Sequence, residues 1–337
     1  MGVMIRDIVP KEEVVLESLS GKKIAIDALN SLYQFLAIIR QRDGTPLMDS
    51  KGRITSHLSG IFYRTCKLME AGIKPVYVFD GEPPILKKEV IEERKEIRKE
   101  AKEKWEQAKE AGDFIEARKY AQASVKITGS MLQDSKLLLD ALGVPWVQAP
   151  SEGEAQAAHM ASKGEVYAAG SQDYDSILFG TPILIRNLTL SRKRKLPGKN
   201  VYVTTPIESI SLSRTLAELG IDRKQLVSLG LLVGTDFCPG VKGIGPKKAL
   251  KMVKDSKSFE EVFSQVEWNA EAPPEVIAEI FLNPEVSGDY KLRWETPNLS
   301  QLVRFMCDEH DFLEERVRKA LEVTAPRSRQ QSLSSFF

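Results

Sequence analysis

Three acidic residues follow short apolar runs that have the composition of β-strands. The run in "KKIAIDALN" leads to Asp27, the run in "KPVYVFDG" leads to Asp80, and "EVYAAGSQDYD" leads to Asp173. A lone aspartate after a strand is most often a turn former or a helix cap. Because ligands bind at the carboxyl ends of parallel strands, these three side chains are expected to lie together at one edge of a sheet.

Four further acidic residues are candidates for the same edge. Asp175 lies two residues beyond Asp173, and Asp236 ends the helical stretch in "LLVGTDF". Glu152 and Glu154 begin a helix, "SEGEAQAA", directly after the short strand in "VPWVQAP". The sequence therefore predicts six carboxylates at one edge of one sheet, too many to be independent helix caps, and Asp236 is a further candidate in a Gly-flanked turn.

The two glutamates allow a second interpretation. Ser151 and Glu154 fit the S-x-x-E capping box, and acidic residues favour the positive end of a helix. On the octapeptide alone, helix capping is the simpler reading of Glu152 and Glu154. The other five acidic residues favour metal binding instead.

Carboxylates packed together without partners repel one another, and some of them take up protons. Divalent cations remove that cost. Oxygen ligands with no cysteine or histidine motif nearby favour Mg²⁺ or Mn²⁺. More carboxylates than one ion needs indicate two ions about 3.5–4 Å apart, an arrangement that hydrolyses phosphodiesters.

Two cations stand close to Asp80 in the chain. Lys87 and Arg94 lie seven residues apart, which is two helical turns, so they share a helix face. They are expected to contact the scissile phosphate and stabilise charge that develops on it. Ion pairs with Glu89 or Glu93 on a solvated helix are the alternative.

Alternating short strands and helical patterns predict an α/β fold with a mainly parallel sheet. A densely charged helical insertion interrupts it at about 81–128 and is expected to arch over the site. We expect a nuclease core over 1–218, a mainly helical region over 219–325, and a flexible, polar tail over 326–337.

The helical region contains "GVKGIGPKKAL". Gly243 and Gly245 flank one residue just before a helix whose first turn carries Lys247 and Lys248. This pattern predicts the hairpin of a helix-hairpin-helix element, in which glycines allow a duplex backbone to approach. Helix N-terminal amides then bind phosphate without reading sequence.

Composition excludes several classes of protein. Hydrophobic content of 42% and charged content of 28% are typical of a soluble globular chain. No apolar run reaches the roughly 18 residues of a membrane span. The three cysteines have no CxxC spacing, which favours an intracellular chain without disulfides or zinc. Net charge is only +1, so basic groups must be local.

Together these segments resemble the flap endonuclease family of structure-specific 5′ nucleases, in its archaeal form. The resemblance rests on "IAIDALNSLYQFL", "GIKPVYVFDGEPP", "APSEGEAQAA", "AAGSQDYDSILFG" and "LLVGTDFCPGVKGIGPKKAL". It implies a PIN-like core, a helical arch that a 5′ single strand threads, and cleavage of 5′ flaps with 5′–3′ exonuclease activity in replication and repair. It also implies a monomer, cytoplasmic in an archaeon.

The resemblance assigns roles to individual positions. The metal ligands for two Mg²⁺ are Asp27, Asp80, Glu152, Glu154, Asp173, Asp175 and Asp236, and the catalytic cations are Lys87 and Arg94. The DNA-contacting residues are Gly2, Tyr33, Arg40, Arg64, Glu152, Gly234, Asp236, Gly243, Gly245, Lys247 and Lys248. A K⁺ ion is expected at the helix-hairpin-helix. Glu82 is a departure, since some relatives carry a basic residue there.

The last residues, "QQSLSSFF", fit the pattern Q-x-x-[LIM]-x-x-F-F through Gln330, Leu333, Phe336 and Phe337. Apolar side chains at the end of a polar tail are expected to fold into a hydrophobic pocket of a partner. The resemblance identifies that partner as the replication sliding clamp.

Two other functions remain as alternatives. One is a different metal-dependent PIN-type nuclease or a phosphatase, which accounts for Asp27 and Asp80 but not for the hairpin or the tail. The other is a clamp-associated DNA scaffold without catalysis. Cleavage assays separate all three.

Overall fold

A computed structural model describes residues 2–189, 193–195 and 202–323. Its centre is a seven-stranded sheet in the order β1-β9-β6-β5-β2-β3-β4. The strands of this sheet are β1 (Glu12–Val14), β2 (Lys23–Asp27), β3 (Lys74–Phe79), β4 (Trp146–Gln148), β5 (Ala168–Gly170), β6 (Ile183–Arg186) and β9 (Ile207–Ser211). Two further strands, β7 (Lys193–Lys195) and β8 (Tyr202–Thr204), form a separate two-stranded sheet.

The five strands from β6 to β4 run parallel, and β9 and β1 add an antiparallel edge. The predicted mainly parallel sheet is therefore confirmed. Strand β2 is buried from its second residue to its last, which explains its continuous apolar sequence. Strand β3 is buried in the same way, so the two strands fix the positions of whatever follows them.

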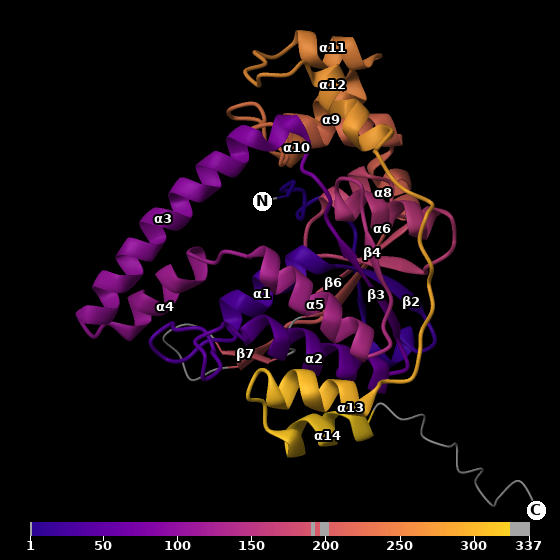
Figure 1. Ribbon diagram of the computed structural model, residues 1–337. Helices are drawn as coiled ribbons and strands as arrows, with labels where there is room; N and C mark the ends of the chain where they lie inside the picture. Colours follow the sequence, from indigo (N-terminus) through magenta and orange to yellow (C-terminus); the bar gives the residue numbers. More distant parts are fainter. Residues whose placement is uncertain (1, 190–192, 196–201, 324–337) are drawn as a thin grey trace, which may run out of the picture.

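Helices cover both faces of the sheet (Figure 1). One face packs against α1 (Ala28–Ile38), α2 (Ser56–Glu70) and α5 (Gly129–Ala141). The other face packs against α6 (Gly153–Ser162), beside which lies the short α7 (Asp175–Leu178). Short 3-10 helices occur at Leu16–Leu19 and Ile85–Lys87.

Five helices form the region that follows the sheet: α8 (Leu212–Leu219), α9 (Arg223–Val233), α10 (Pro246–Asp255), α11 (Phe259–Ser264) and α12 (Pro274–Leu282). They share one hydrophobic core with residues of α6 and α7. The predicted boundary near residue 218 falls at the last turn of α8.

The last helices lie elsewhere, at the opposite end of the molecule in Figure 1. These are α13 (Leu299–Leu302), the π-helical turn η3 (Val303–Asp308) and α14 (Glu314–Glu322), and they pack against α2 and α5. The segment 283–298 reaches them without regular structure. Its Trp294 donates to the Pro75 carbonyl at 2.7 Å, and its Glu295 amide donates to the Gly143 carbonyl at 2.8 Å.

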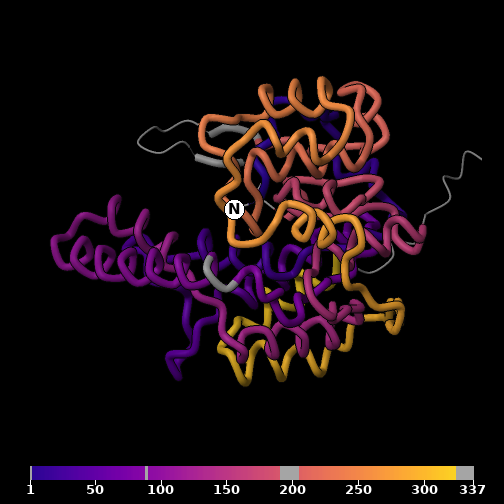
Figure 2. Tube along the Cα trace, turned by 90° about the horizontal axis from the view of Figure 1, so that it is seen from above, coloured from indigo at the N-terminus to yellow at the C-terminus, as the bar shows by residue number. Residues whose placement is uncertain are grey.

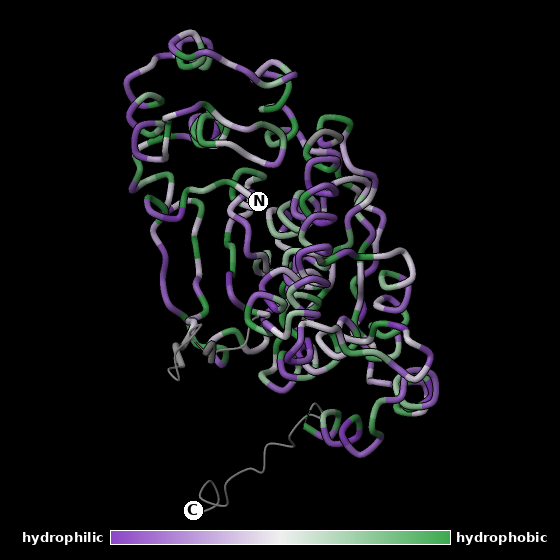
Figure 3. The backbone as a smooth tube through the Cα atoms, turned by 90° about the vertical axis from the view of Figure 1, so that its left-hand side faces the viewer, coloured by the Kyte–Doolittle hydropathy of each residue, from purple (hydrophilic) through white to green (hydrophobic). Residues whose placement is uncertain are grey.

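The charged insertion forms two helices, α3 (Lys88–Glu110) and α4 (Phe114–Ala123), which we call the arch. Seen from above, the arch projects away from the rest of the molecule (Figure 2). Its backbone is drawn mostly in the hydrophilic colour of Figure 3, as its sequence of lysines and glutamates requires. Among the described helices, none is both long enough and apolar enough to cross a bilayer.

Candidate active site

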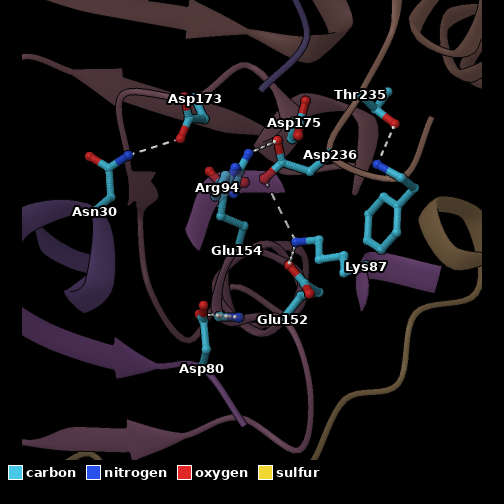
Figure 4. Close-up of polar contacts among 12 residues, drawn as sticks. Asn30, Asp80, Lys87, Arg94, Glu152, Glu154, Asp173, Asp175, Thr235 and Asp236 are labelled. Carbon is cyan, nitrogen blue, oxygen red and sulfur yellow. Dashed lines mark hydrogen bonds and ion pairs between the residues drawn. The ribbon is translucent and has the colours of Figure 1, made fainter. Parts of the chain in front are cut away.

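A cavity of about 370 Å³ opens between the carboxyl ends of the strands and the first half of α3. All seven predicted acidic residues line it, as do Lys87 and Arg94. We call the acidic side of this cavity the floor and the side formed by α3 the roof. Figure 4 shows Lys87 between Glu152 and Asp236, and Arg94 against Asp236, while Asp173 points toward Asn30.

Asp27 ends β2 and begins α1. One carboxylate oxygen accepts a hydrogen bond from the Asn30 amide at 2.9 Å, so Asp27 caps the helix. The other oxygen faces the Ser171 hydroxyl at 3.4 Å. Burial raises the pKa of Asp27 well above its usual value, and the charges of Asp80 and Asp173 raise it further. Helix capping and membership of the acidic floor are therefore compatible in one residue.

Asp80 follows β3 and caps a helix that belongs to another part of the chain. Its Oδ1 accepts a hydrogen bond from the Gly153 amide at 2.8 Å. A Cβ atom on Gly153 would stand 2.4 Å from that oxygen, so the close approach requires glycine. Burial raises the pKa of Asp80 to about 6, with the charge of Glu152 as the next contribution.

The predicted capping box at the start of α6 does not form. Glu152 occupies the N-cap position without a side-chain capping bond, and Asp80 satisfies the Gly153 amide instead. Glu154 turns inward, where its Oε1 accepts hydrogen bonds from Ser171 at 2.6 Å and Ser176 at 2.7 Å. Burial, followed by the charges of Asp173 and Asp27, raises the pKa of Glu154.

Asp173 and Asp175 lie between the N-terminal segment and α1. The Asn30 side-chain amide donates to Asp173 Oδ2 at 2.9 Å, and the Val3 backbone amide donates to Asp175 Oδ1 at 2.7 Å. Burial raises the pKa of Asp175 to about 7. A Cβ atom on Gly2 would lie 2.9 Å from the Asp173 Cβ, so the structure places Gly2 against the floor.

The roof cations pair with the floor. Lys87 Nζ lies 2.5 Å from Glu152 Oε2 and 3.9 Å from Asp236 Oδ2, and it stands over the Phe237 ring at 4.6 Å. Arg94 donates to Asp236 Oδ1 at 2.7 Å. Burial alone would lower the pKa of Lys87, but the adjacent Glu152 carboxylate outweighs it and the pKa is raised.

An aromatic residue and a third cation extend the roof. The Arg98 guanidinium lies 5.4 Å from the centre of the Tyr33 ring and donates to the Tyr33 hydroxyl at 3.2 Å. Arg98 stands four residues after Arg94, so both point from α3 into the cavity. Such a pair of a cation and an aromatic ring suits a phosphate beside a base.

The donor chemistry of the floor fits divalent cations. The burial and mutual repulsion that raise four carboxyl pKa values are costs that a bound cation offsets. As the side chains stand, no three acidic, histidine or cysteine residues within 2–189, 193–195 and 202–323 are arranged to hold an ion. The reason is visible in the contacts: Glu152 faces Lys87, Asp236 faces Arg94, and Glu154 faces two serines.

Other predicted DNA-contacting residues lie outside the cavity lining. Arg40 donates to the carbonyls of Leu36 and Gly44. Arg64 is half-buried on α2. Gly234 follows α9 with φ of 107°, where a Cβ atom would meet the Pro239 carbonyl oxygen at 2.9 Å.

The predicted hairpin joins α9 to α10. Gly245 caps α10 and Gly243 has φ of 80°, and a Cβ atom on either would meet nothing within 4 Å. Lys247 and Lys248 fall in the first turn of α10, as the sequence predicts. The backbone of this turn is thus open to a partner. The predicted clamp-binding residues lie outside the described residues: Gln330, Leu333, Phe336 and Phe337.

Sequence reasoning missed three polar residues that act on the site: Asn30, Arg98 and Ser171. Each carries a weak signal in the chain. Arg98 continues the helical spacing of Lys87 and Arg94, and Ser171 stands two residues before Asp173. Asn30 occupies the third position after the capping Asp27.

Comparison with known proteins assigns the family. Residues 3–101 match the XPG N-terminal domain and residues 143–236 match the XPG I-region. Flap endonuclease 1 of Pyrococcus abyssi is 57% identical over 341 residues, covering 100% of this chain and 98% of the relative. Flap endonuclease 1 of Staphylothermus marinus is 53% identical over 350 residues, covering 100% of both chains.

Solved structures agree. Flap endonuclease-1 from Methanococcus jannaschii superposes with a TM-score of 0.76 at 41% identity, covering 96% of this chain and 98% of that one. The catalytic core of Rad2 in complex with DNA substrate gives a TM-score of 0.71 at 27% identity, covering 96% and 100%. The predicted fold class, a PIN-like α/β nuclease core, is confirmed. The chain therefore belongs to the flap endonuclease family of structure-specific nucleases.

Proposed function

We propose that this protein cleaves the 5′ flap of branched DNA where the single strand meets the duplex, with two Mg²⁺ ions, which Mn²⁺ can replace. The observation that carries the proposal is one cavity lined by seven carboxylates together with Lys87, Arg94 and Arg98. Carboxylates alone would repel a phosphodiester. The facing cations attract it, so both halves of the cavity are needed.

The floor residues would hold the ions. Asp27 and Asp80 are set by buried strands, and Glu154 is oriented by two serine hydroxyls. Divalent cations bound there supply Lewis acidity for in-line hydrolysis of a phosphodiester. Asn30 would fix the orientation of the Asp173 carboxylate, since its side-chain amide donates to Asp173 Oδ2.

The roof residues would act on the phosphate itself. When a scissile phosphate enters, Lys87 and Arg94 exchange Glu152 and Asp236 for its oxygens. Charge that develops on those oxygens is then stabilised by cations already held over the floor. The Tyr33 ring would offer a stacking surface to the neighbouring base.

The turn between α9 and α10 would hold the duplex. Its glycines leave the backbone open, and the amides at the start of α10, with Lys247 and Lys248, suit phosphate oxygens. We include a K⁺ ion at this turn in the proposal. Contacts of this kind position a duplex without reading its sequence.

The test compares three substrates: a double-flap DNA, a single-stranded RNA and a phosphomonoester. We expect cleavage of the flap at its junction when Mg²⁺ or Mn²⁺ is present, and none in EDTA. Preferential cleavage of the RNA or the phosphomonoester would overturn the proposal in favour of another metal-dependent phosphohydrolase.

Asp173→Ala separates catalysis from binding. It should abolish cleavage while flap binding, measured by fluorescence anisotropy, stays within about threefold. Asp289→Ala, an exposed aspartate in the 283–298 segment, is the matched control and should leave both unchanged. A wild-type protein that binds flaps but never cuts them would establish the scaffold alternative.

The tail extends the proposal to a partner. We include the sliding clamp because Leu333, Phe336 and Phe337 follow Gln330 at the spacing of its binding motif. Replacing both phenylalanines by alanine should remove stimulation of cleavage by the clamp and leave unstimulated cleavage intact. Equal loss of both activities would contradict this assignment.

A further inference from the structure

The arch is attached to the core in two different ways. Its inner half, residues 88–98, reaches the core through charged contacts: Arg94 with Asp236 and Arg98 with Tyr33. Its outer half, residues 101–123, packs against residues 41–45, a tight turn that follows α1. We call residues 41–45 the α1 turn.

Two side chains of α3 bind the α1 turn directly. The Trp105 indole N–H donates to the Asp43 carbonyl at 3.0 Å. Lys109 Nζ lies 2.9 Å from Asp43 Oδ2 and donates to Thr45 Oγ1 at 2.9 Å. Hydrogen bonds from Thr45, followed by Lys109, lower the pKa of Asp43 to about 2.

A glycine allows the close packing. Gly44 is buried and has φ of 84°, which side chains other than glycine rarely adopt. A Cβ atom there would stand 2.7 Å from Ala121 Cβ, 2.9 Å from Trp105 Nε1 and 3.2 Å from the Ala117 carbonyl. Ala117 and Ala121 are fully buried. The α1 turn therefore fills a notch between α3 and α4.

The α1 turn is itself fixed to α1. Arg40 Nε donates to the Leu36 carbonyl at 2.6 Å, and its Nη1 donates to the Gly44 carbonyl at 2.7 Å. The Asp43 carboxylate accepts from the Thr45 amide at 2.9 Å and hydroxyl at 2.7 Å. Helix α1 also carries Tyr33 and is capped by Asp27, so one rigid element holds the α1 turn and part of the floor.

The cations of the roof and the contacts to the α1 turn share one face of α3. Arg94, Arg98, Ala101 and Trp105 follow one another at spacings of four, three and four residues, and each is less exposed than its neighbours. Seven residues, or about 10 Å of helix, separate Arg98 from Trp105. The rotation and height of α3 at Trp105 therefore determine where Arg98 and Arg94 stand.

We propose that the α1 turn is the fixed mounting of the arch, and that Trp105, Lys109 and Asp43 are positioning residues for Arg94 and Arg98. The outer half of the arch stays docked on α1, while the inner half moves when its ion pairs with the floor exchange for phosphate. This inference rests on the proposed function for its effect on cleavage, but not for its effect on the free protein.

The first test is hydrogen exchange of the free protein, without DNA or metal. Trp105→Phe combined with Lys109→Met keeps an aromatic ring and an unbranched side chain at these positions and removes the polar contacts to Asp43 and Thr45. Because each lost bond contributes about 1 kcal/mol, we expect amide exchange in residues 101–121 to accelerate at least tenfold. Lys104→Met is the matched control, because Lys104 pairs only with Glu100 on the exposed face of the same helix, at 3.6 Å, among the described residues.

The second test is flap cleavage under saturating and limiting DNA. We expect the double variant to lower kcat about tenfold and to change KM by less than twofold, because the duplex is held at the α9–α10 turn. Restoring a cation with Lys109→Arg in the Trp105→Phe background should recover most of kcat. A loss of folding would instead lower the melting temperature and the fraction of active protein.

The outcomes separate this inference from the proposed function. If amide hydrogen exchange in residues 101–121 is unchanged in the double variant, or is accelerated equally by Lys104→Met, the proposal that the α1 turn is the fixed mounting of the arch is wrong. Accelerated exchange with unchanged kcat overturns the positioning role. A wild-type protein that does not cut flaps overturns the proposed function, while the exchange result still decides whether the arch is mounted on the α1 turn.

Discussion

The inner half of the arch and the C-terminal helices α13–α14 are both helical additions to the same sheet, yet different interactions hold them: charged contacts for the first and apolar burial for the second. In the C-terminal pair, Leu302, Met306 and Val317 are fully buried against α2 and α5. In the inner half of the arch, residues 90–98 have no buried side chain, and charges make the contacts to the core. One addition stabilises the fold and the other serves the cavity.

The difference teaches that helix content says little about rigidity. Apolar burial holds α13–α14 in place, because exposing those side chains to water again would cost free energy. Ion pairs near the surface contribute little to stability and exchange readily for other charges. On the proposed function, the inner half of the arch releases a phosphate after each reaction, and exchangeable ion pairs suit that role.

The largest effect on stability should come from the C-terminal pair. Leu302→Ala leaves a cavity beneath α13, so we expect the free energy of unfolding to fall by about 3 kcal/mol, measured by denaturant titration. Cleavage at 25 °C should stay within twofold, because α13, which carries Leu302, contributes none of the described residues that line the cavity. Leu302→Met is the control. A large loss of kcat in folded Leu302→Ala protein would contradict the conclusion that α13–α14 stabilise the fold without contributing to the cavity.

Arg94→Met tests the arch in the opposite sense. We expect kcat for flap cleavage to fall about a hundredfold, since one cation facing the developing charge is lost. The free energy of unfolding should change by no more than about 0.5 kcal/mol, because the Arg94 pair is partly exposed. Lys102→Met, whose partner Glu106 lies 3.9 Å away on the outer face of α3, should change neither quantity. Destabilisation as large as that of Leu302→Ala would show that the arch is structural too.

A smaller effect on the free energy of unfolding should appear when the pH is lowered, and it arises where α2 packs against the C-terminal helices. His57 is fully buried, neither ring nitrogen has a hydrogen-bond partner among the described residues, and burial lowers its pKa to about 4, with His310 as a second cause. The unfolded chain, with a histidine pKa of about 6.5, therefore takes up the proton first. Stability is full above pH 6.5 and is lost as the pH falls toward 4.

This linkage predicts a loss of about 2 kcal/mol between pH 8 and pH 5 from His57 alone. The measurement is the difference in unfolding free energy between the wild type and His57→Leu, which lacks the titrating ring. That difference should shift in favour of the variant as the pH falls. A difference that is constant with pH would show that His57 is protonated equally in both states.

Much of the floor could be predicted from the chain because the sheet converts sequence into position. Asp27, Asp80 and Asp173 follow apolar strand runs, and parallel strands bring their ends to one edge. Lys87 and Arg94 could be predicted for a similar reason, since helical periodicity determines which residues share a face. Local regularity determines the location in each case.

Other features depend on contacts between distant segments, which no local pattern specifies. The Ser151–Glu154 capping box does not form because the Glu154 side chain accepts from Ser171 and Ser176, and Asp80, more than seventy residues earlier in the chain, satisfies the Gly153 amide. Arg40 carries no signal that it braces the α1 turn, because its partners are backbone carbonyls. The packing of α13–α14 against α2 could not be predicted either, since an amphipathic pattern shows which face of a helix is buried but not which element covers it.

The 283–298 segment, which has no regular structure, has a consequence for how the protein comes apart. The buried Gln156 side chain holds the Ser287 amide and carbonyl at 2.8 and 2.9 Å, and Trp294 and Asn298 tie later residues to the core. The 283–298 segment therefore connects the α9–α12 region at one end of the molecule with α13–α14 at the other, and it is hydrogen-bonded to the core between them. Unfolding of either end would break the contacts of this segment with α6 and β3. We therefore expect thermal unfolding in one cooperative transition, although the domain layout suggests two.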